Sequence, residues 1–490
     1  MADKPKKTRI RVMALDSIPA GEGEFNADTI KEQKKTLPEG VTSKMLYGDV
    51  LDIAWPSFVE LFLTQVAAMV NMMMVGGLGA SAIAAVGLTT QPRFLLMTFF
   101  MALNVGSTAM VARSKGAGNQ ERANLFMRQV LMINFGLTLL VSVAGYATAG
   151  HMIRFMAAGG QTEETIIGGI IYLRIQMLGF LFFAITATIT AALRGAGETR
   201  VAMVYNLVAN VVNVFTGFLI IYGRFGFPRL ELVGASIALV FGQFVAFVLA
   251  MWSVMSGRYY LHLRFKDGFM PNKDAITQVV RIGFPSMLEQ LAMRVGMIIF
   301  NLFIAGLGTV AFATHQITMN IQAMSFMTGQ AFAVSGTSLV GQSLGRKRLD
   351  MAHHYASKTR RIGMCVAILM GITFFFFGRQ IVGLYTYEAE IIAMGGGIMM
   401  MMAFILPFQN SQFILAGALR GAGDTKATAV IVFITVLFMR PIMGFITINA
   451  FELGLWGAWI TIACDQLVRT GLVMLRFYSG KWMSIKGITG

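Results

Sequence analysis

The chain has 490 residues, of which 56% are hydrophobic and only 13% charged, whereas about a quarter are charged in ordinary soluble proteins. Apolar stretches of about 20 residues recur along it, which excludes a soluble protein and predicts an all-α integral membrane protein. The formal net charge of +16 lies mostly in the links between these stretches, so it reports membrane topology and predicts no nucleic-acid partner.

The first segment, residues 1–47, is polar and carries both charge signs. It lacks the apolar core of a cleaved secretory signal, so we interpret it as a cytoplasmic tail. Its mixed charge and its lack of periodic apolar residues predict disorder.

Twelve apolar stretches follow, and each is long enough for a transmembrane helix. They divide the rest of the chain into an N-terminal lobe at 48–257, a cytoplasmic link at 258–277, a C-terminal lobe at 278–478 and a cytoplasmic C-terminus at 479–490. The predicted helices lie near 50–76, 83–111, 124–149, 166–191, 201–223, 232–256, 278–305, 310–341, 356–377, 390–418, 427–450 and 455–478.

Lysine and arginine are concentrated in alternate links, such as 113–128, 258–273 and 346–361. The opposite links contain little beyond Arg154, Arg224, Arg229 and Arg379. Because positive residues collect on the cytoplasmic side, both termini are expected there, in a multi-pass protein of the prokaryotic cytoplasmic (inner) membrane.

The two halves repeat one another. Trp55–Gly79 matches Phe284–Gly308 at a constant shift of 229 residues, which aligns Glu60 with Glu289. Since each repeat has six helices, an even number, the halves share one orientation. The sequence therefore predicts two six-helix lobes related by a pseudo-two-fold axis along the membrane normal.

A glycine-rich run gives the strongest repeat signal, because Leu193–Arg200 (LRGAGETR) reappears as Leu419–Lys426 (LRGAGDTK). No strand precedes the run and no Gly-Lys-Thr closes it, so a phosphate-binding loop is not indicated. We interpret each copy as a helix C-terminus with a glycine cap, followed by a charged turn that braces its lobe.

These two runs, the Pro-Ser pairs near the start of the first and seventh helices, and Val-Gly-Gly-Leu-Gly at 75–79 resemble the multidrug and toxic compound extrusion (MATE) family. The resemblance extends from about Gly48 to nearly the end of the chain. It implies an antiporter that exchanges sodium ions or protons for amphipathic organic cations by alternating access. Such a carrier acts within the lipid bilayer, needs no cofactor beyond its coupling ion, and is expected here as a monomer.

The chain departs from the family at three positions. Asn71, Met293 and Gln409 stand where many members carry an acid. The usual coupling carboxylates are therefore missing.

Other polar residues could bind the coupling ion. Glu60, Thr64 and Asn71 lie within about 40° on one helix face, where carboxylate, hydroxyl and amide oxygens suit a hard cation and a desolvated carboxylate suits a proton. Glu289, followed by Gln290, holds the matching place in the second lobe. A hydrogen bond across a helix interface remains the alternative for Glu60.

For Glu289 the alternative is a structural ion pair with Arg294 or Arg174. Arg440 and Asp465 lie at similar depth in adjacent helices and are expected to form a buried ion pair, since a buried charge needs a partner. Gln65, Gln91, Gln409 and Asn410 are candidate contacts for a substrate in the cavity.

No catalytic set or ATP-binding loop is present, so the protein is not expected to be an enzyme. Cys365 and Cys464 lie far apart in apolar stretches and indicate no metal site beyond a transported sodium ion. Two alternatives to drug efflux remain. One is a flippase for a lipid-linked precursor, which a larger number of arginines in the cavity would favour. The other is a non-transporting receptor or scaffold, which would require a large soluble domain.

Overall fold

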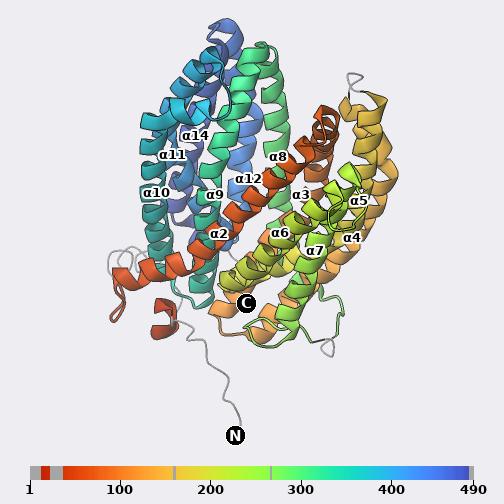
Figure 1. Cartoon of the computed structure of the whole chain (residues 1–490). Coiled ribbons are helices and arrows are strands. Elements are labelled where there is room, and N and C mark those ends of the chain that lie inside the picture. Colours follow the sequence, from red (N-terminus) through yellow and green to blue (C-terminus); the bar gives the residue numbers. More distant parts are fainter. Residues whose placement is uncertain (1–12, 22–36, 158–161, 265–267, 485–490) are drawn as a thin grey trace.

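The computed structural model describes residues 13–21, 37–157, 162–264 and 268–484. Within these ranges every regular element is a helix. Figure 1 shows the helices gathered into two lobes, which we call the N lobe (α2–α7) and the C lobe (α8–α14). The predicted all-α membrane fold is confirmed.

The helix bounds extend the predicted ranges by a few residues. α2 begins five residues before the predicted lobe start at 48, and α8 begins within the predicted link at 258–277. The long elements are α2 Ser43–Gly76, α3 Ala80–Gly116, α4 Gln120–Ala157, α5 Glu163–Gly195, α6 Thr199–Tyr222, α7 Glu231–Met255, α8 Lys273–Ala305, α9 Thr309–Gly345, α10 Leu349–Gly383, α11 Ala389–Gly421, a composite helix at 425–450, and α14 Gly454–Tyr478.

In the described part of the chain, 11 of these helices are long and apolar enough to cross a membrane. The twelfth long helix, α9, does not reach that apolarity. It carries buried polar side chains, among them His315, Thr318 and Gln322, which neighbouring helices shield from lipid.

The first helix of each lobe crosses to the other lobe. α2 packs on α6 of its own lobe and on α9 of the C lobe, while α8 packs on α12 (Thr425–Val432) and on α3 of the N lobe. We call the end with the turns at 117–119, 196–198, 346–348 and 422–424 the basic end, and the end with the turns at 77–79, 306–308 and 451–453 the far end. Figure 1 shows the lobes together at the basic end and apart at the far end.

At the basic end the two lobes touch through backbone. A Cβ atom on Gly116 of α3 would lie 1.9 Å from the carbonyl oxygen of Gln342, and one on Gly345 of α9 would lie 2.0 Å from that of Arg113. Only glycine fits at this crossing, so the lobes are closely packed there.

The composite helix of the C lobe departs from α-helical geometry. π-helical stretches at Phe433–Met439 and Ile446–Ala450 flank α13 (Arg440–Phe445), which contains Pro441. The amide of Arg440 donates to the carbonyl of Thr435, five residues back. Proline at 441 lacks an amide and crowds the preceding turn, and the wider π turns relieve that crowding.

The described part of the polar tail does not fit the predicted disorder. Residues 13–21 contain the 3-10 helix η1 (Ala14–Ser17), whose Ala14 and Leu15 are 1% exposed. The Ala14 amide donates to Asp49 at 2.8 Å, and Arg346 donates to the carbonyl of Leu15 at 2.5 Å. Three apolar residues, Ala14, Leu15 and Ile18, pack into a cluster formed with α2, α9 and α10, which stabilises this short segment.

Candidate functional site

The two glycine-rich runs form matching turns at the basic end. Gly197 and Gly423 adopt φ values of +75° and +77°, which favour glycine, and each follows a helix C-terminus. The amides of Glu198 and Asp424 donate back to the carbonyls of Leu193 and Leu419, at 2.8 Å each. The predicted glycine caps are confirmed.

These turns also join the two lobes. Gln342 of α9 donates to the carbonyl of Gly195 in the N lobe at 3.1 Å, as does Ser338. In the opposite direction, Arg113 of α3 donates to the carbonyl of Ala422 in the C lobe. The last carbonyls of α5 and α11, which have no partner within their own helices, thus receive donors from the opposite lobe.

Glu60 lies at the interface of α2 and α6. Its Oε1 atom accepts from Asn206 at 2.6 Å and lies 2.9 Å from an Nη atom of Arg194, the arginine of the first glycine-rich run. The other oxygen, Oε2, is buried and has no hydrogen-bond partner. One turn further along α2, Thr64 donates to the Glu60 carbonyl at 2.8 Å and accepts from Asn210 at 3.0 Å.

Glu289 holds the matching place on α8 and is 2% exposed. Its Oε1 atom forms an ion pair with Arg420, the arginine of the second run, and its Oε2 atom accepts from Thr428 at 2.8 Å. Neither Arg294 nor Arg174 is its partner, so that sequence-based alternative is wrong in its choice of arginine. Instead, Arg294 lies over the ring of Phe94, and Arg174 over that of Tyr146.

A second group of charges is buried within the C lobe. Asp465 of α14 accepts through Oδ2 from Arg440 and from Arg469, one turn along the same helix. Asp465 is 0% exposed, Arg469 2% and Arg440 6%. Two guanidinium groups and one carboxylate leave one net positive charge at this place.

The other candidate residues are spread over several surfaces. Gln65 and Gln91 are exposed, and Asn71 and Gln290 are half-buried. Gln409 is buried and accepts from Gln322 of α9 at 3.4 Å. Asn410 is also buried, and neither of its side-chain polar atoms has a hydrogen-bond partner.

Five partners of the acids were missed from the sequence, among them Thr428 of α12, an uncharged donor to Glu289. In the sequence, Arg194 and Arg420 indicate only which links are positively charged. Asn206 is uncharged, so nothing in the sequence marks it as a partner of an acid. Arg469 could have been found, because residues four apart on a helix are neighbours and Asp465 lies four positions before it.

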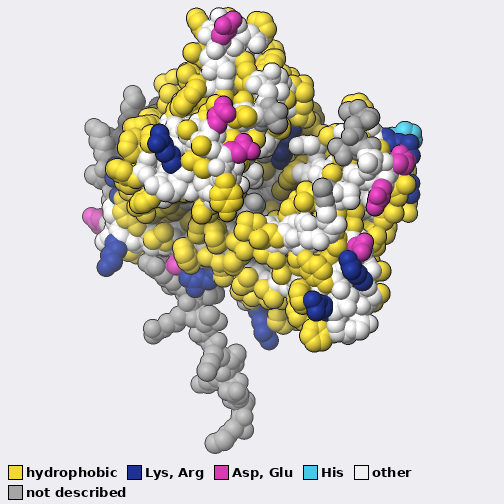
Figure 2. Space-filling view, turned by 45° about the horizontal axis from the view of Figure 1, so that its top comes forward, with side chains coloured by type: hydrophobic (Ala, Val, Ile, Leu, Met, Phe, Trp, Pro, Cys, Tyr) yellow, Lys and Arg dark blue, Asp and Glu magenta, His cyan; other side chains and the backbone are white. Residues whose placement is uncertain are grey.

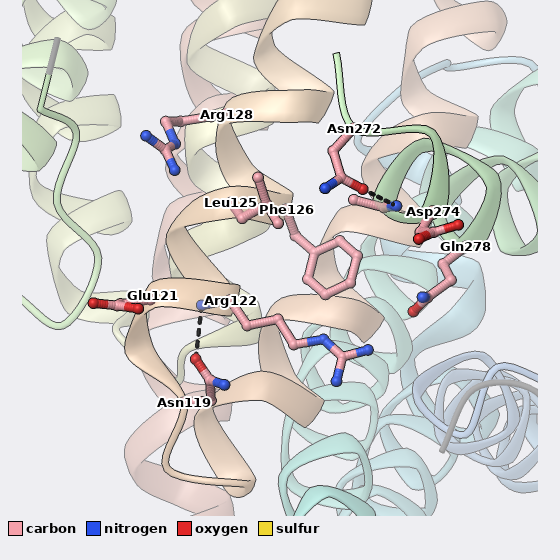
Figure 3. A pocket seen from close by; sticks show the side chains of 10 residues that line it. Asn119, Glu121, Arg122, Leu125, Phe126, Arg128, Asn272, Asp274 and Gln278 are labelled. Atoms are coloured by element: carbon pink, nitrogen blue, oxygen red, sulfur yellow. Dashed lines mark hydrogen bonds between the residues drawn. The ribbon is translucent and has the colours of Figure 1, made fainter. Parts of the chain in front are cut away.

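A cavity of about 620 Å³ opens at the basic end, between the first turns of α4 and α8. Figure 3 shows charged side chains of both signs around it, among them Glu121, Arg122 and Asp274. The two hydrogen bonds drawn there cap helix starts: Asn119 accepts from the amide of Arg122 at 2.8 Å, and Asn272 from that of Ala275 at 2.9 Å. The cavity is separate from the three membrane-depth acids.

Two repeated lobes of membrane-spanning helices, closed against each other at one end, define a multi-pass membrane transporter. The family model MatE matches residues 56–219 and 285–446, which is most of both lobes. The chain belongs to this family, whose members are transporters and not enzymes.

Relatives and solved structures agree with this assignment. A probable multidrug resistance protein NorM of Thermotoga maritima is 27% identical over 436 residues, which cover 89% of this chain and 92% of the relative. Multidrug resistance protein MdtK of Yersinia enterocolitica is 26% identical over 385 residues, covering 78% of this chain and 84% of that protein.

Two structures share the fold. A MOP superfamily transporter from Pyrococcus furiosus, described by the reverse polarity of its binding pocket, matches with a TM-score of 0.82 at 20% identity over 93% of this chain and 98% of that one. A multidrug resistance MATE family transporter of the MOP superfamily in an outward-facing conformation matches with a TM-score of 0.82 at 19% identity, covering 94% and 100% of the two chains.

Proposed function

We propose that this protein is a secondary active efflux transporter for amphipathic organic compounds, in which the two lobes alternate the access of a cavity between them. The cross-lobe hydrogen bonds at the two glycine-rich turns carry this proposal. Backbone carbonyls and single side-chain donors can exchange partners, so such a contact can open and close as a unit. The relatives named multidrug resistance proteins support drug-like compounds as substrates.

The orientation follows from the lysines and arginines of the basic end, which favour the cytoplasmic side of a prokaryotic inner membrane, with both termini inside. The described conformation would then be closed to the cytoplasm and open to the outside. Figure 2, viewed towards the far end, shows the surface hollowed between the two lobes.

Of the two matched acids, Glu60 is the better candidate for coupling. It has one carboxylate oxygen without a partner, with Thr64 one turn away, whereas both oxygens of Glu289 are occupied. An unpartnered oxygen can accept a proton or help to bind sodium when the neighbouring guanidinium moves. Glu289 then has a structural role, because it links α8 to Arg420 of the second glycine-rich run.

The substrate's charge is not fixed by the fold, since the Pyrococcus furiosus transporter of this fold is described by a reverse polarity of its pocket. Organic cations, which the family resemblance implies, stay a prediction.

Purified protein in proteoliposomes tests coupling directly. Uptake of fluorescent organic cations and anions is measured under separate sodium and proton gradients. We expect gradient-dependent transport by the parent protein, loss of that dependence in Glu60→Gln, and its retention in Glu289→Gln. Glu163→Gln is the matched control, because Glu163 forms an exposed ion pair with Arg154. Transport that ignores both gradients in the parent protein contradicts ion coupling.

The flippase alternative has one observation in its favour: within the described ranges, Arg294 lies in a candidate span and forms no ion pair with an acid. Proteoliposomes with a fluorescent lipid phosphate in one leaflet test it. Movement of this lipid between leaflets, without transport of soluble compounds, would favour the flippase.

A further inference from the structure

Each of the three acids at membrane depth is paired with at least one arginine. Glu60 and Glu289 are each in contact with the arginine of a glycine-rich turn, and Asp465 is in contact with two arginines. A carboxylate already neutralised by a guanidinium attracts a second cation only weakly. Within the described residues, these three acids therefore do not favour an organic cation in the cavity.

Arg294 is in the opposite situation. It lies eleven residues before the end of α8 at Ala305, about 16 Å along the helix axis and within a candidate span. Its side chain is half-buried, and no carboxylate forms an ion pair with it in the described part of the chain. Placing a cation at such depth is costly, and an unpaired one suggests a functional role.

Its position places it between the lobes. α8 and α3 approach closely towards the basic end, where a Cβ atom on Gly106 would lie 2.6 Å from the carbonyl oxygen of Val279 and one on Gly283 3.1 Å from that of Ala102. Further towards the far end, the Arg294 guanidinium lies 4.6 Å from the ring centroid of Phe94 on α3, and the Phe94 side chain is 39% exposed. The neighbouring Met293 faces the C lobe, with its sulfur 4.0 Å from Arg469.

Arg294 thus sits where the closely packed part of the α3–α8 interface ends and the lobes begin to separate. At the shift of 229 residues its counterpart in the N lobe is Gln65, an exposed and uncharged side chain. The matched positions therefore contribute one positive charge and no negative one.

We infer that Arg294 and Phe94 form a binding site for the acidic group and the adjoining apolar ring of an amphipathic organic anion. This inference rests on the proposed transport function and names the substrate class. The guanidinium supplies a charge-assisted hydrogen bond to a carboxylate, sulfonate or phosphate, and the partly exposed Phe94 side chain packs against the apolar part of the ligand. Because the two residues belong to α8 and α3, a ligand held by both contacts two lobes that move apart in the transport cycle.

Two dyes with one ring system test the charge preference. Fluorescein is an anionic xanthene and rhodamine 6G a cationic one. Their binding to purified protein is measured by fluorescence polarisation, and their transport is measured in proteoliposomes. We expect the parent protein to bind and transport fluorescein in preference to rhodamine 6G.

Variants assign the preference to Arg294. Arg294→Gln should weaken fluorescein binding by about tenfold or more, and Arg294→Lys, which keeps the charge, should retain most of it. Arg294→Glu should turn the preference towards rhodamine 6G, a gain that a misfolded protein would not give. Arg174→Gln is the matched control: Arg174 also lies at membrane depth over an aromatic ring, but it is exposed on the face that it shares with Tyr146 of α4.

Three results would overturn the inference. Transport of rhodamine 6G alone by the parent protein would leave the efflux function standing but contradict the anion site. Fluorescein binding by Arg294→Gln that equals binding by the parent protein would place the anion elsewhere. Transport of neither dye by the folded parent protein would remove the proposed efflux function together with this site.

Discussion

Glu60 and Glu289 occupy the same place in the two repeats. The second hydrogen-bond donor to each acid, however, comes from a different turn of the neighbouring helix. In the C lobe the second donor is Thr428, at the start of α12, and it reaches Glu289 Oε2. In the N lobe the corresponding residue, 226 positions earlier, is Ala202, which has no hydroxyl group. The amide of Asn206, one turn further along α6, donates to the Glu60 oxygen that already contacts Arg194.

This difference shows how a duplicated framework can give two roles. The repeated arginine holds each acid against its glycine-rich turn, while a single position on the next helix decides whether the second carboxylate oxygen has a hydrogen-bond donor. In the C lobe both oxygens of Glu289 have partners, whereas in the N lobe one oxygen of Glu60 stays available for an ion.

The largest effect on stability should come from removing the charge of Glu289, whose two carboxylate oxygens both have partners. Glu289→Gln leaves the Arg420 guanidinium in a mostly buried place without its carboxylate, and we expect a loss of about 3 kcal/mol in the free energy of unfolding. Glu60→Gln should cost less, about 1–2 kcal/mol, because Asn206 can still donate to the glutamine oxygen.

Thermal unfolding in detergent compares the two variants. Glu163→Gln, in an exposed ion pair, is the control and should change stability by less than about 0.5 kcal/mol. Equal losses at positions 60 and 289 would contradict the contrast between the two acids.

A smaller loss of stability should follow from a substitution that makes the surroundings of Glu289 resemble those of Glu60. Thr428→Ala removes the donor to Glu289 Oε2 and leaves that acid with one unpartnered oxygen, as at Glu60. We expect a loss of about 1–2 kcal/mol, the usual result of leaving a buried acceptor without its donor. The same unfolding measurement checks it, with Thr373→Ala as control, since Thr373 is exposed and donates only to its own helix.

The smallest effect concerns the acids of the two turns. Asp424 forms an ion pair with Arg476 at 2.7 Å, whereas Glu198 accepts from the amide of Tyr260 at 2.9 Å. Burial raises the pKa of Glu198 above its ordinary value of 4.5, although the Tyr260 amide and Lys115 act in the opposite direction. Because the folded protein binds this proton more tightly, the contribution of Glu198 to stability is fully present below pH 4.5 and is lost as the pH rises through the folded pKa.

Glu198→Gln should therefore be more stable than the parent protein at pH 8 and lose that advantage as the pH falls to 4.5. Unfolding temperatures at the two pH values measure this difference. A variant that is equally destabilised at both would show that the carboxylate is held by its contacts and is not strained by burial.

The sequence was sufficient for the repeat, the lobes and the glycine caps, because each depends on local pattern. It was insufficient for the partners of Glu60 and Glu289. Arg194 and Arg420 belong to the last turn of their helices by position, but their long side chains reach towards the acids of the first helix in each lobe. Each of these contacts joins two helices that are distant along the chain, and no spacing in the sequence reports it.

The N-terminal segment was misjudged for a related reason. Ala14, Leu15 and Ile18 are too few to indicate structure by themselves, and they become ordered on a surface built from α2, α9 and α10. Arg346, which counts as a topology residue in the sequence, supplies donors to the Leu15 carbonyl and to Asp16.

Residues 13–21 bind to a surface formed by the rest of the same chain. Residues 13–21 bind the Arg346 turn of the C lobe, while the Met13 side chain lies against Gly197 in the glycine-rich turn of the N lobe. A peptide joined to its own binding surface has a local concentration in about the millimolar range, so even weak contacts keep it bound most of the time. In the proposed transport cycle, separation of the lobes at the basic end would break the contact between Met13 and Gly197, so residues 13–21 would oppose that opening.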